Sequence, residues 1–428
     1  MVINMGIKIQ TKTGILEGID KISHWQFLGV PFAQPPVGRL RFRAPEPVKK
    51  WEGVRKADTF AAMPIQYDGT HMPLYGKEFF NDPKYIREKS EDCLYLNIWC
   101  PPKREDHKSA VAIWIHGGAF HHGWASETEI DGEGFCKRDV IYISVEYRMG
   151  VFGFLTPRER LEAGEYCGNY GLLDQLMAIL WVKENIEYFG GDPENITIFG
   201  QSAGAISCQL LCNVSGTKGL FQKAIFQSGA GIGTGLDTDM SLKYGLEFYD
   251  RYLKKLGAET IDELEKADTW VLYQDYLELL DQEENVSLRP CVDGKFIKQP
   301  VEKNILEGKM HNLSYMIGAN SEDMDDEVGK DTLYKAAENF ALLCCDQGRK
   351  VPYVYYFSHQ LPGSEDGAFH SAELWYVFGT LGRCWRAMTS EDYALSEVMM
   401  DAWCNFMKNG EPGIEDWNPY HISGRKEF

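Results

Sequence analysis

The order of four short sequence patterns limits the folds open to this chain. Three runs of β-branched and aromatic residues, at 110–115, 140–145 and 196–199, each end near a glycine or a polar turn, which is typical of buried strands. Between the last two runs, apolar residues recur at the spacing of one helix face, at Leu173, Leu176, Met177, Leu180 and Trp181. Gly190 and Gly191 then stop the helix. Because a strand, a helix and a strand in this order form a parallel unit, we predict an α/β fold with a mostly parallel, doubly wound central sheet.

Domain organisation is inferred from what the 428 residues lack. No repeat of about 20 to 50 residues and no linker rich in Pro, Gly or Ser divides the sequence, so residues 1–428 are predicted to form a single domain. Residues 234–285 differ from the rest because Leu, Tyr, Asp, Glu and Lys mix at helical spacing with few β-branched runs. They predict helices that lie either over the sheet, as a helical cap, or on its flank.

The charge and the cysteines narrow the partners and the compartment. With 44 Lys and Arg against 63 Asp and Glu, the net charge is −19, which repels nucleic-acid phosphates and anionic membrane surfaces. The longest apolar run found, 110–115, is far shorter than the roughly 20 residues of a membrane span. The N-terminus shows no export signal, and eleven cysteines without a CxxC pattern fit a reducing compartment. We expect a cytoplasmic monomer or small homo-oligomer with no nucleic-acid or membrane partner.

A G-x-S-x-G pattern supplies a candidate nucleophile. It runs Gly200-Gln201-Ser202-Ala203-Gly204, after the predicted strand 196–199 and before a helix that opens with small residues. A sharp strand-to-helix turn of this kind lifts the serine above the edge of the sheet. The pattern alone is weak, because 42 glycines leave room for a chance match. Its context predicts that Ser202 is a nucleophile, activated by a base that removes its proton.

The turn after the strand 110–115 offers backbone donors for an oxyanion. The segment His116-Gly117-Gly118-Ala119-Phe120 has two residues without side chains, so the N–H groups of Gly117 and Gly118 can point inward. The N–H group of Ala203, at the start of the predicted helix, gives a third donor. The alternative is an ordinary Gly-Gly turn. Beside the serine pattern, we interpret Gly117, Gly118 and Ala203 as an oxyanion hole.

With these motifs the sequence resembles the type-B carboxylesterase family, a group of α/β-hydrolases that includes bacterial para-nitrobenzyl esterases and cholinesterases. The resemblance covers most of the chain and rests on segments in family order, at 27–33, 90–97, 116–120, 168–175, 189–193, 200–204 and 226–229. It implies an α/β-hydrolase fold with helical cap insertions, and hydrolysis of short-chain or aryl carboxylic esters through an acyl-enzyme without a cofactor. Lipase, thioesterase, amidase or lactonase activity is the alternative, followed by a non-catalytic adhesion protein.

The acid and the base should follow the serine in that order, each on a loop after a later strand. From the residues alone, four acidic side chains compete for the acid: Glu322, Asp323, Asp325 and Asp326. Two histidines compete for the base: His359 and His370. The resemblance selects Asp323, five residues after Gly318, where the family mostly has glutamate. It also selects His370, within a segment similar to the one that carries the family's catalytic histidine.

Phe120 and Trp124 are predicted to contact the substrate, since they lie in or just after the glycine-rich turn. Family members often have a small serine near Trp124, so this ring should narrow the cleft. His121 and His122 are expected in the cleft or at the surface, and no metal site is predicted because no carboxylate or cysteine lies at ligand spacing. The segment 229–288 is shorter than in typical members, which implies a reduced cap.

Overall fold

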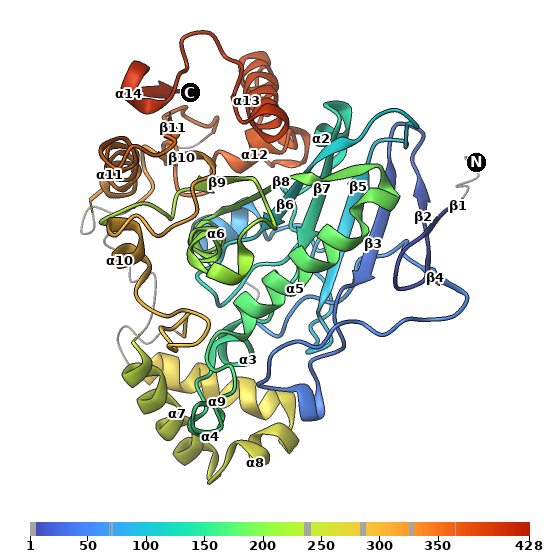
Figure 1. The fold of residues 1–428 in the computed structure, drawn as a ribbon, viewed down its shortest axis with the longest axis vertical. Helices are drawn as coiled ribbons and strands as arrows, with labels where there is room; N and C mark the ends of the chain where they lie inside the picture. Colours follow the sequence, from blue (N-terminus) through green and yellow to red (C-terminus); the bar gives the residue numbers. More distant parts are fainter. Residues whose placement is uncertain are drawn as a thin grey trace.

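A single twisted sheet of twelve strands runs through the molecule (Figure 1). The computed structural model describes residues 6–67, 69, 72–234, 241–282, 288–324, 329–363 and 365–428. Within these residues the strand order is β1-β2-β3-β5-β7-β6-β8-β9-β10-β11-β12, and β4 pairs with β2. The strands are β1 (Gly6–Gln10), β2 (Ile15–Asp20), β3 (Trp25–Pro31), β4 (Val54–Lys56), β5 (Tyr95–Cys100), β6 (Ser109–Ile115), β7 (Val140–Val145), β8 (Gly191–Gln201), β9 (Lys223–Gln227), β10 (Ser314–Asn320), β11 (Tyr353–Phe357) and β12 (Arg425–Glu427).

The sheet is parallel over most of its width. Neighbouring strands from β7 to β12 run parallel, whereas the four strands β1, β2, β3 and β5 pair antiparallel with one another and β5 pairs antiparallel with β7. Every residue of β6, β7 and β9 is buried, as expected for strands that are covered on both faces. The predicted mostly parallel sheet is therefore confirmed.

Helices cover both faces of this sheet and form two hydrophobic cores. One core includes residues of α5 (Tyr170–Asn185), α6 (Ala203–Asn213) and α11 (Thr332–Asp346), and the other includes residues of α2 (Glu133–Lys137), α12 (Leu374–Val377) and α13 (Ser390–Asn409). Because side chains alternate along a strand, Ile113 of β6 packs in the first core and Trp114 in the second. The predicted helix between two strands is α5, between β7 and β8, so the doubly wound arrangement is confirmed. Other short helices lie along the chain: α1 (Pro73–Glu78), α10 (Val301–Leu306), α14 (Tyr420–Ser423), η1 (Gly38–Leu40), η2 (Ile186–Phe189), η3 (Ser215–Thr217) and η4 (Leu381–Arg383).

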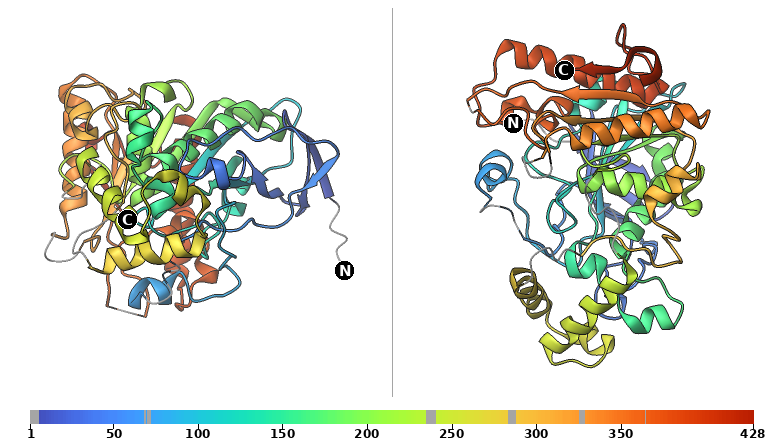
Figure 2. Two further views of the ribbon diagram at one scale, coloured as in Figure 1. Left: turned by 90° about the horizontal axis from the view of Figure 1, so that it is seen from below. Right: turned by 90° about the vertical axis from the view of Figure 1, so that its left-hand side faces the viewer.

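Three helices at one end of the molecule come from the segment predicted as a cap or a flank. They are α7 (Leu242–Leu256), α8 (Ile261–Lys266) and α9 (Thr269–Gln282), and we call them the three-helix insertion. Residues 235–240 and 283–285 of that segment lie outside the described residues. The insertion lies beside α3 (Gly150–Phe154) and α4 (Arg158–Glu162), as Figures 1 and 2 show. There Tyr249 donates its hydroxyl hydrogen to Glu159 at 2.8 Å.

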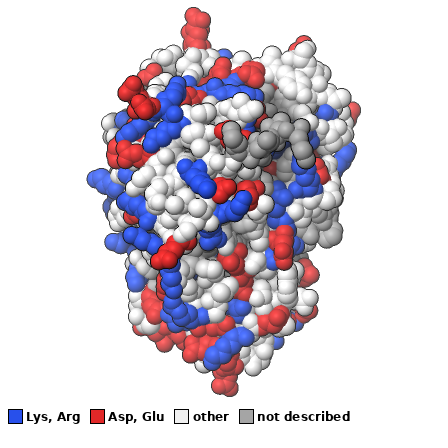
Figure 3. All heavy atoms as spheres, turned by 90° about the vertical axis from the view of Figure 1, so that its right-hand side faces the viewer, with Lys and Arg blue, Asp and Glu red and all other residues white. Residues whose placement is uncertain are grey.

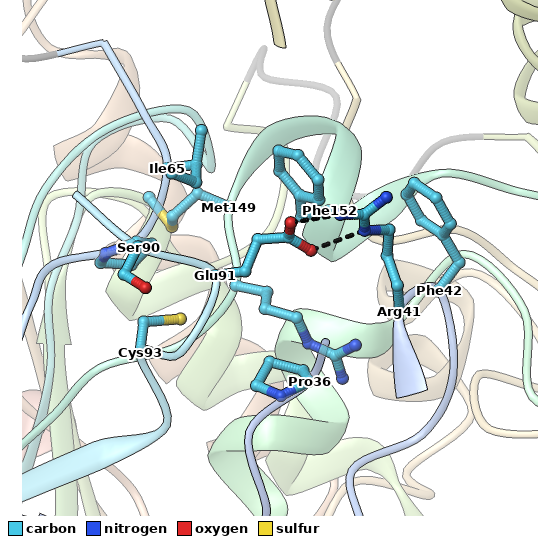
Figure 4. A pocket seen from close by; sticks show the side chains of 11 residues that line it. Pro36, Arg41, Phe42, Ile65, Ser90, Glu91, Cys93, Met149 and Phe152 are labelled. Atoms are coloured by element: carbon cyan, nitrogen blue, oxygen red, sulfur yellow. Dashed lines mark hydrogen bonds and ion pairs between the residues drawn. The ribbon is translucent and has the colours of Figure 1, made fainter. Parts of the chain in front are cut away.

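A buried arginine ties the insertion to the N-terminal part of the chain. Nε and Nη2 of Arg41 donate to the carboxylate of Glu91 at 2.7 and 2.6 Å, as Figure 4 shows. Nη1 of Arg41 donates to the carbonyl oxygens of Leu264 and Ala267 at 2.9 and 2.7 Å. These carbonyls lie at the end of α8, where backbone oxygens lack the next helical turn as a partner, and the oxygen of Leu264 also accepts the N–H group of Ala267 at 3.2 Å. Arg41 and Glu91 also line a cavity of about 10 Å³, which is room for about one water molecule.

Charges of both signs share the surface, and the described cysteines form no disulfide bonds. Lys and Arg side chains lie among Asp and Glu side chains over the face shown in Figure 3. All eleven cysteines lie in the described ranges, where none forms a disulfide and Cys345 is the exposed one. In the part of the chain that the structure describes, no helix is both long and apolar enough to span a bilayer.

Replacement of Arg148 by methionine should strongly destabilise the fold. Nε and Nη2 of Arg148 donate to the carboxylate of Asp174 on α5 at 2.8 and 2.7 Å, and both side chains are buried. Because Arg148→Met leaves a buried carboxylate unpaired, the free energy of unfolding should fall by about 3 to 5 kcal/mol, measured by urea denaturation. Arg158→Met is the matched control, since it breaks an exposed pair with Asp250 and should change that free energy by less than about 1 kcal/mol. Equal losses in the two variants would contradict the prediction.

Candidate active site

Ser202 stands on a strained turn between β8 and α6. Its backbone angles, φ 54° and ψ −124°, lie in a region that residues with side chains rarely adopt. Two glycines make the turn possible, because a Cβ on Gly204 would lie 2.0 Å from the Ile115 oxygen and one on Gly200 would lie 2.5 Å from the carbonyl carbon of Gly204. The N–H group of Ser202 donates to the oxygen of Gln227 at 2.8 Å. Ser202 consequently lines a cavity at the edge of the sheet.

The turn after β6, residues 117–122, has an unusual backbone, and we call it the glycine turn. Three consecutive residues have positive φ: Gly118 (98°), Ala119 (52°) and Phe120 (65°). The oxygen of Gly118 accepts the N–H groups of His121 and His122 at 2.9 and 3.0 Å. A Cβ on Gly118 would lie only 1.9 Å from the oxygen of His122, so this position requires glycine.

Three backbone N–H groups of the cavity wall have no protein acceptor. Within the described residues, the N–H groups of Gly117, Gly118 and Ala203 form no hydrogen bond to another protein group. All three residues line the same cavity as Ser202, and a Cβ on Gly117 would lie 3.2 Å from the Cβ of Ser202. Unpaired N–H groups in a turn and at a helix start attract an anion. The structure thus brings the three predicted oxyanion-hole residues together beside Ser202.

His370 and Asp323 are joined by a hydrogen bond. Asp323 follows β10, and its carboxylate accepts the N–H group of Asn320 at 2.7 Å and the Nδ1 hydrogen of His370 at 2.7 Å. Burial alone lowers the pKa of His370, but the hydrogen bond and charge of Asp323, together with the charge of Glu373, outweigh burial and raise this pKa above its ordinary value of 6.5. His370, held by the carboxylate of Asp323 behind it, lies in the wall of the cavity that holds Ser202.

Gln201, which was not predicted to have a role, holds the other nitrogen of His370. The side-chain amide nitrogen of Gln201 lies 3.0 Å from Nε2 of His370. Because Nδ1 of His370 donates to Asp323, Nε2 accepts this hydrogen from Gln201. Among the described residues, no hydrogen bond joins Ser202 Oγ to His370. In this structure, Nε2 of His370 is therefore bound to Gln201 and not to Ser202. Only its position beside Ser202 in the sequence could have drawn attention to Gln201.

The rival acids and the rival histidine lie in other surroundings. Glu322 pairs with Lys330 at 2.5 Å, and its side chain is 35% exposed. Two other acidic candidates lie outside the described residues: Asp325 and Asp326. His359 binds Asp392 at the start of α13 with Nε2 at 2.7 Å, and it does not line the cavity of Ser202. Of the described candidates, Asp323 and His370 are the ones that the structure joins.

Glu373 is a second buried carboxyl group behind His370, and no role was predicted for it. It is fully buried, and it accepts hydrogens from Asn320 Nδ2 at 2.7 Å and Gln227 Nε2 at 3.1 Å. Burial, followed by the nearby charge of Asp323, raises the pKa of Glu373 to about 7. Glu373 therefore adds negative charge behind His370 as the pH rises through this pKa, and it does not itself line the cavity of Ser202. Its place three residues after His370 was the only available signal.

The cavity beside Ser202 has a volume of about 370 Å³ and a largely aromatic wall. The aromatic side chains of the wall are Tyr75, Phe79, Phe80, Trp114 and Phe120. Phe120 is thus where a substrate contact was predicted. Besides His370, the titratable side chains of the wall that are not aromatic rings of Tyr, Phe or Trp are His122, Glu127, Glu129 and Arg289. Such a mixture is typical of a site for a small organic molecule.

Trp124 does not line this cavity, contrary to the prediction. Its side chain is fully buried, its Nε1 donates to the oxygen of Tyr85 at 3.0 Å, and its ring lies 5.2 Å from the ring of Phe80. The ring packs behind the wall because apolar neighbours there surround its hydrocarbon part and a carbonyl oxygen accepts its N–H group. Trp124 therefore supports the wall from behind, where it contacts Phe80.

The two histidines of the glycine turn occupy different places. His122 lines the cavity, and burial lowers its pKa to about 4. Burial, followed by the charges of His122 and Arg289, lowers the pKa of His121 to about 4 as well. Both rings are therefore neutral near pH 7. In the described ranges, no group of three or more His, Cys, Asp and Glu side chains is arranged to hold a metal ion.

Comparison with known proteins gives consistent relatives. A sequence model of the carboxylesterase family matches residues 6–332 and 324–427. The para-nitrobenzyl esterase of Bacillus subtilis (strain 168) is 32% identical, over 98% of this chain and 93% of that protein. Carboxylesterase 4A of Bos taurus is 30% identical, over 94% of this chain and 86% of that protein. A solved structure of a PNB esterase is similar with a TM-score of 0.85 and 29% identity, covering 96% of this chain and 92% of its own. These relatives confirm the resemblance and the α/β-hydrolase fold.

Replacement of Glu373 by glutamine should lower the pKa of His370. The charge of Glu373 is one cause of the raised pKa of His370, so its removal acts in the opposite direction. The measurement is an NMR titration of ¹⁵N-labelled histidine side chains in the wild type and in Glu373→Gln. Glu322→Gln is a suitable control, because that carboxylate faces Lys330 and should leave the titration of His370 unchanged. An unchanged or raised pKa of His370 in Glu373→Gln would contradict the prediction.

Proposed function

Because the chain belongs to the carboxylesterase family and is a carboxylic ester hydrolase, we propose that Ser202 attacks the ester carbonyl and forms an acyl-enzyme. The observation that carries the proposal is the bond between His370 and Asp323 in the cavity that also exposes Ser202. A base held by a buried carboxylate next to a serine on a strained turn is the arrangement that activates a hydroxyl group.

The first half of the reaction forms the acyl-enzyme. Nε2 of His370 leaves Gln201 and accepts the hydroxyl hydrogen of Ser202 as Oγ bonds to the carbonyl carbon. The carbonyl oxygen becomes an oxyanion, which the N–H groups of Gly117, Gly118 and Ala203 stabilise. The imidazolium of His370, stabilised by Asp323, then gives its proton to the alkoxide as the C–O bond breaks and the alcohol departs.

In the second half, water takes the place of Ser202 as the attacking group, and the carboxylic acid is released. A water molecule loses a proton to Nε2 of His370 and attacks the acyl carbon. The same backbone donors hold the second oxyanion, and the proton returns to Oγ of Ser202 as the acid leaves. Each step uses a group of this chain, so the proposed reaction needs no cofactor.

We propose short-chain or aryl esters as the substrate class. Support comes from the cavity, since about 370 Å³ fits a small ester and five aromatic side chains offer apolar and ring-stacking contacts. Hydrolysis of nitrophenyl esters graded by acyl length tests this preference. Rates that rise steadily to long acyl chains would contradict it.

Replacement of Ser202 by alanine should lower kcat/KM for nitrophenyl acetate by about 10⁵ to 10⁶, because the attacking oxygen is lost. A phosphonate probe should add its mass to the wild type at Ser202 and leave Ser202→Ala unmodified. Ser207→Ala is the control, as this serine lies on the same helix, is buried, and accepts a hydrogen from Gln175 at 3.2 Å. A phosphonate found on Ser371, the other serine of the cavity wall, would refute the assignment.

Activity should fall in acid with a midpoint above pH 6.5. The base must be neutral to accept a proton, and the pKa of His370 is raised, so acid protonates it at a higher pH than an ordinary histidine. In Asp323→Asn the raising charge is lost, so the remaining activity, lower by about 10⁴, should have its acid midpoint at a lower pH. The measurement is kcat/KM from pH 5 to 9. A flat profile in the wild type would count against His370.

A further inference from the structure

The glycine turn stores backbone strain at the point where the proposed oxyanion binds. Ala119 and Phe120 carry side chains and still have φ of 52° and 65°. Residues with a Cβ avoid this region, and they remain there only when the surroundings hold them. The contacts that hold the turn are therefore part of how its N–H groups are aimed.

Backbone hydrogen bonds account for part of this restraint. The oxygen of Gly118 accepts two N–H groups from the end of the turn, and the N–H group of Gly150 donates to the oxygen of Phe120 at 2.7 Å. The side chain of Gln66 binds the backbone of Gly123 twice: its Oε1 accepts the N–H group at 2.7 Å, and its Nε2 donates to the carbonyl oxygen at 2.9 Å. These contacts fix the two ends of the turn, while the side chain of His121 reaches out of it toward the three-helix insertion.

The contact of His121 with the insertion is short and buried. The hydroxyl group of Tyr276, on α9, lies 2.6 Å from Nδ1 of His121, and the two rings are stacked at an angle of 21°. Tyr276 is 1% exposed. Burial raises the pKa of Tyr276 and lowers that of His121, so both groups are neutral near pH 7 and share an uncharged hydrogen bond.

The helix that carries Tyr276 is itself fixed to the body of the protein. Nη1 of Arg41 binds the carbonyl oxygen of Ala267, and its Nη2 lies 3.3 Å from the hydroxyl oxygen of Thr269, at the first residue of α9. Further along α9, a Cβ on Gly150 would lie 3.0 Å from the ring of Tyr276. The ring therefore packs against the residue whose N–H group binds the glycine turn.

We propose that Tyr276 is a positioning residue for the oxyanion hole, acting through His121. Its hydroxyl group holds the strained turn in the conformation in which the N–H groups of Gly117 and Gly118 line the cavity. The inference rests on the oxyanion role given to that turn under the proposed function. Tyr276 touches no reacting atom, so its loss should weaken binding of the tetrahedral state and leave binding of the ester itself nearly unchanged.

The test compares Tyr276→Phe with Tyr252→Phe. Both changes remove one buried hydroxyl group from the insertion, but Tyr252 donates to the oxygen of Leu272 at 2.6 Å and has no bond to the turn. With nitrophenyl acetate, Tyr276→Phe should lower kcat by about ten- to a hundredfold with KM within about twofold, whereas Tyr252→Phe should keep both. Equal kcat values for the two variants would overturn the proposal.

A second readout separates positioning from loss of structure. The affinity for a trifluoromethyl ketone, which Ser202 converts into a tetrahedral adduct, should fall in Tyr276→Phe by about the same factor as kcat. Thermal unfolding of each variant accompanies the kinetics. If Tyr276→Phe does not fold, His121→Ala breaks the same bond from the turn and gives the same two readouts. Loss of kcat with unchanged ketone affinity would overturn the proposal.

The double variant Tyr276→Phe/His121→Ala tests whether the two residues act through one bond. Its kcat should equal that of the less active of the two single variants, because the bond can be lost only once. Multiplied losses would overturn the proposed coupling. Phosphonate labelling distinguishes the two levels of inference: a wild type that is not labelled at Ser202 refutes the proposed function, whereas labelled variants with equal rates refute only the role of Tyr276.

Discussion

The close approach of α6 to the end of β6 is the contact from which the rest of the site follows. A Cβ on Gly204 would lie 2.0 Å from the oxygen of Ile115, so the two elements meet only because this position has no side chain. That approach sets the nucleophile of one strand-to-helix turn against the donors of the turn that follows the neighbouring strand. The strain at Ser202 and in the glycine turn is then maintained by the two cores that cover both faces of the sheet.

Opposing electrostatic effects determine the state of the base. Burial disfavours the charged form of His370, whereas Asp323 and Glu373 favour it, and the carboxyl groups prevail. Gln201 acts on the other nitrogen, where its amide hydrogen can be accepted only by the neutral ring. In this structure, the carboxyl groups near Nδ1 raise the pKa of His370, while Gln201 occupies the lone pair of Nε2. In the proposed mechanism, Nε2 must exchange Gln201 for Ser202 as its partner before the hydroxyl hydrogen can move.

Sequence patterns predicted the features that depend on neighbours along the chain. The runs 110–115 and 140–145 became β6 and β7, and the third run became the end of β8 at the serine turn. These predictions succeeded because a buried parallel strand has a continuous apolar signature. The strands β1, β2 and β4 were not predicted, as the exposure of their side chains gives a weaker signal.

Features set by side-chain direction and distant contacts were beyond the sequence. Trp124 was predicted in the cleft, but whether a ring after a turn points into a cavity or behind its wall depends on packing with Phe80. The choice of Asp323 and His370 needed the family resemblance, because spacing left several candidates. The contact of Tyr276 with His121 joins residues 155 positions apart, and no local pattern marks it. One consequence concerns the order of folding. The site draws on β6, β8, β10, the loop after β11 and a helix of the insertion, so its residues are far apart in the sequence, and such non-local closure is slow. Recovery of turnover during refolding should therefore lag behind recovery of helical circular dichroism. A molecule becomes active only after β10 and β11 have joined the sheet.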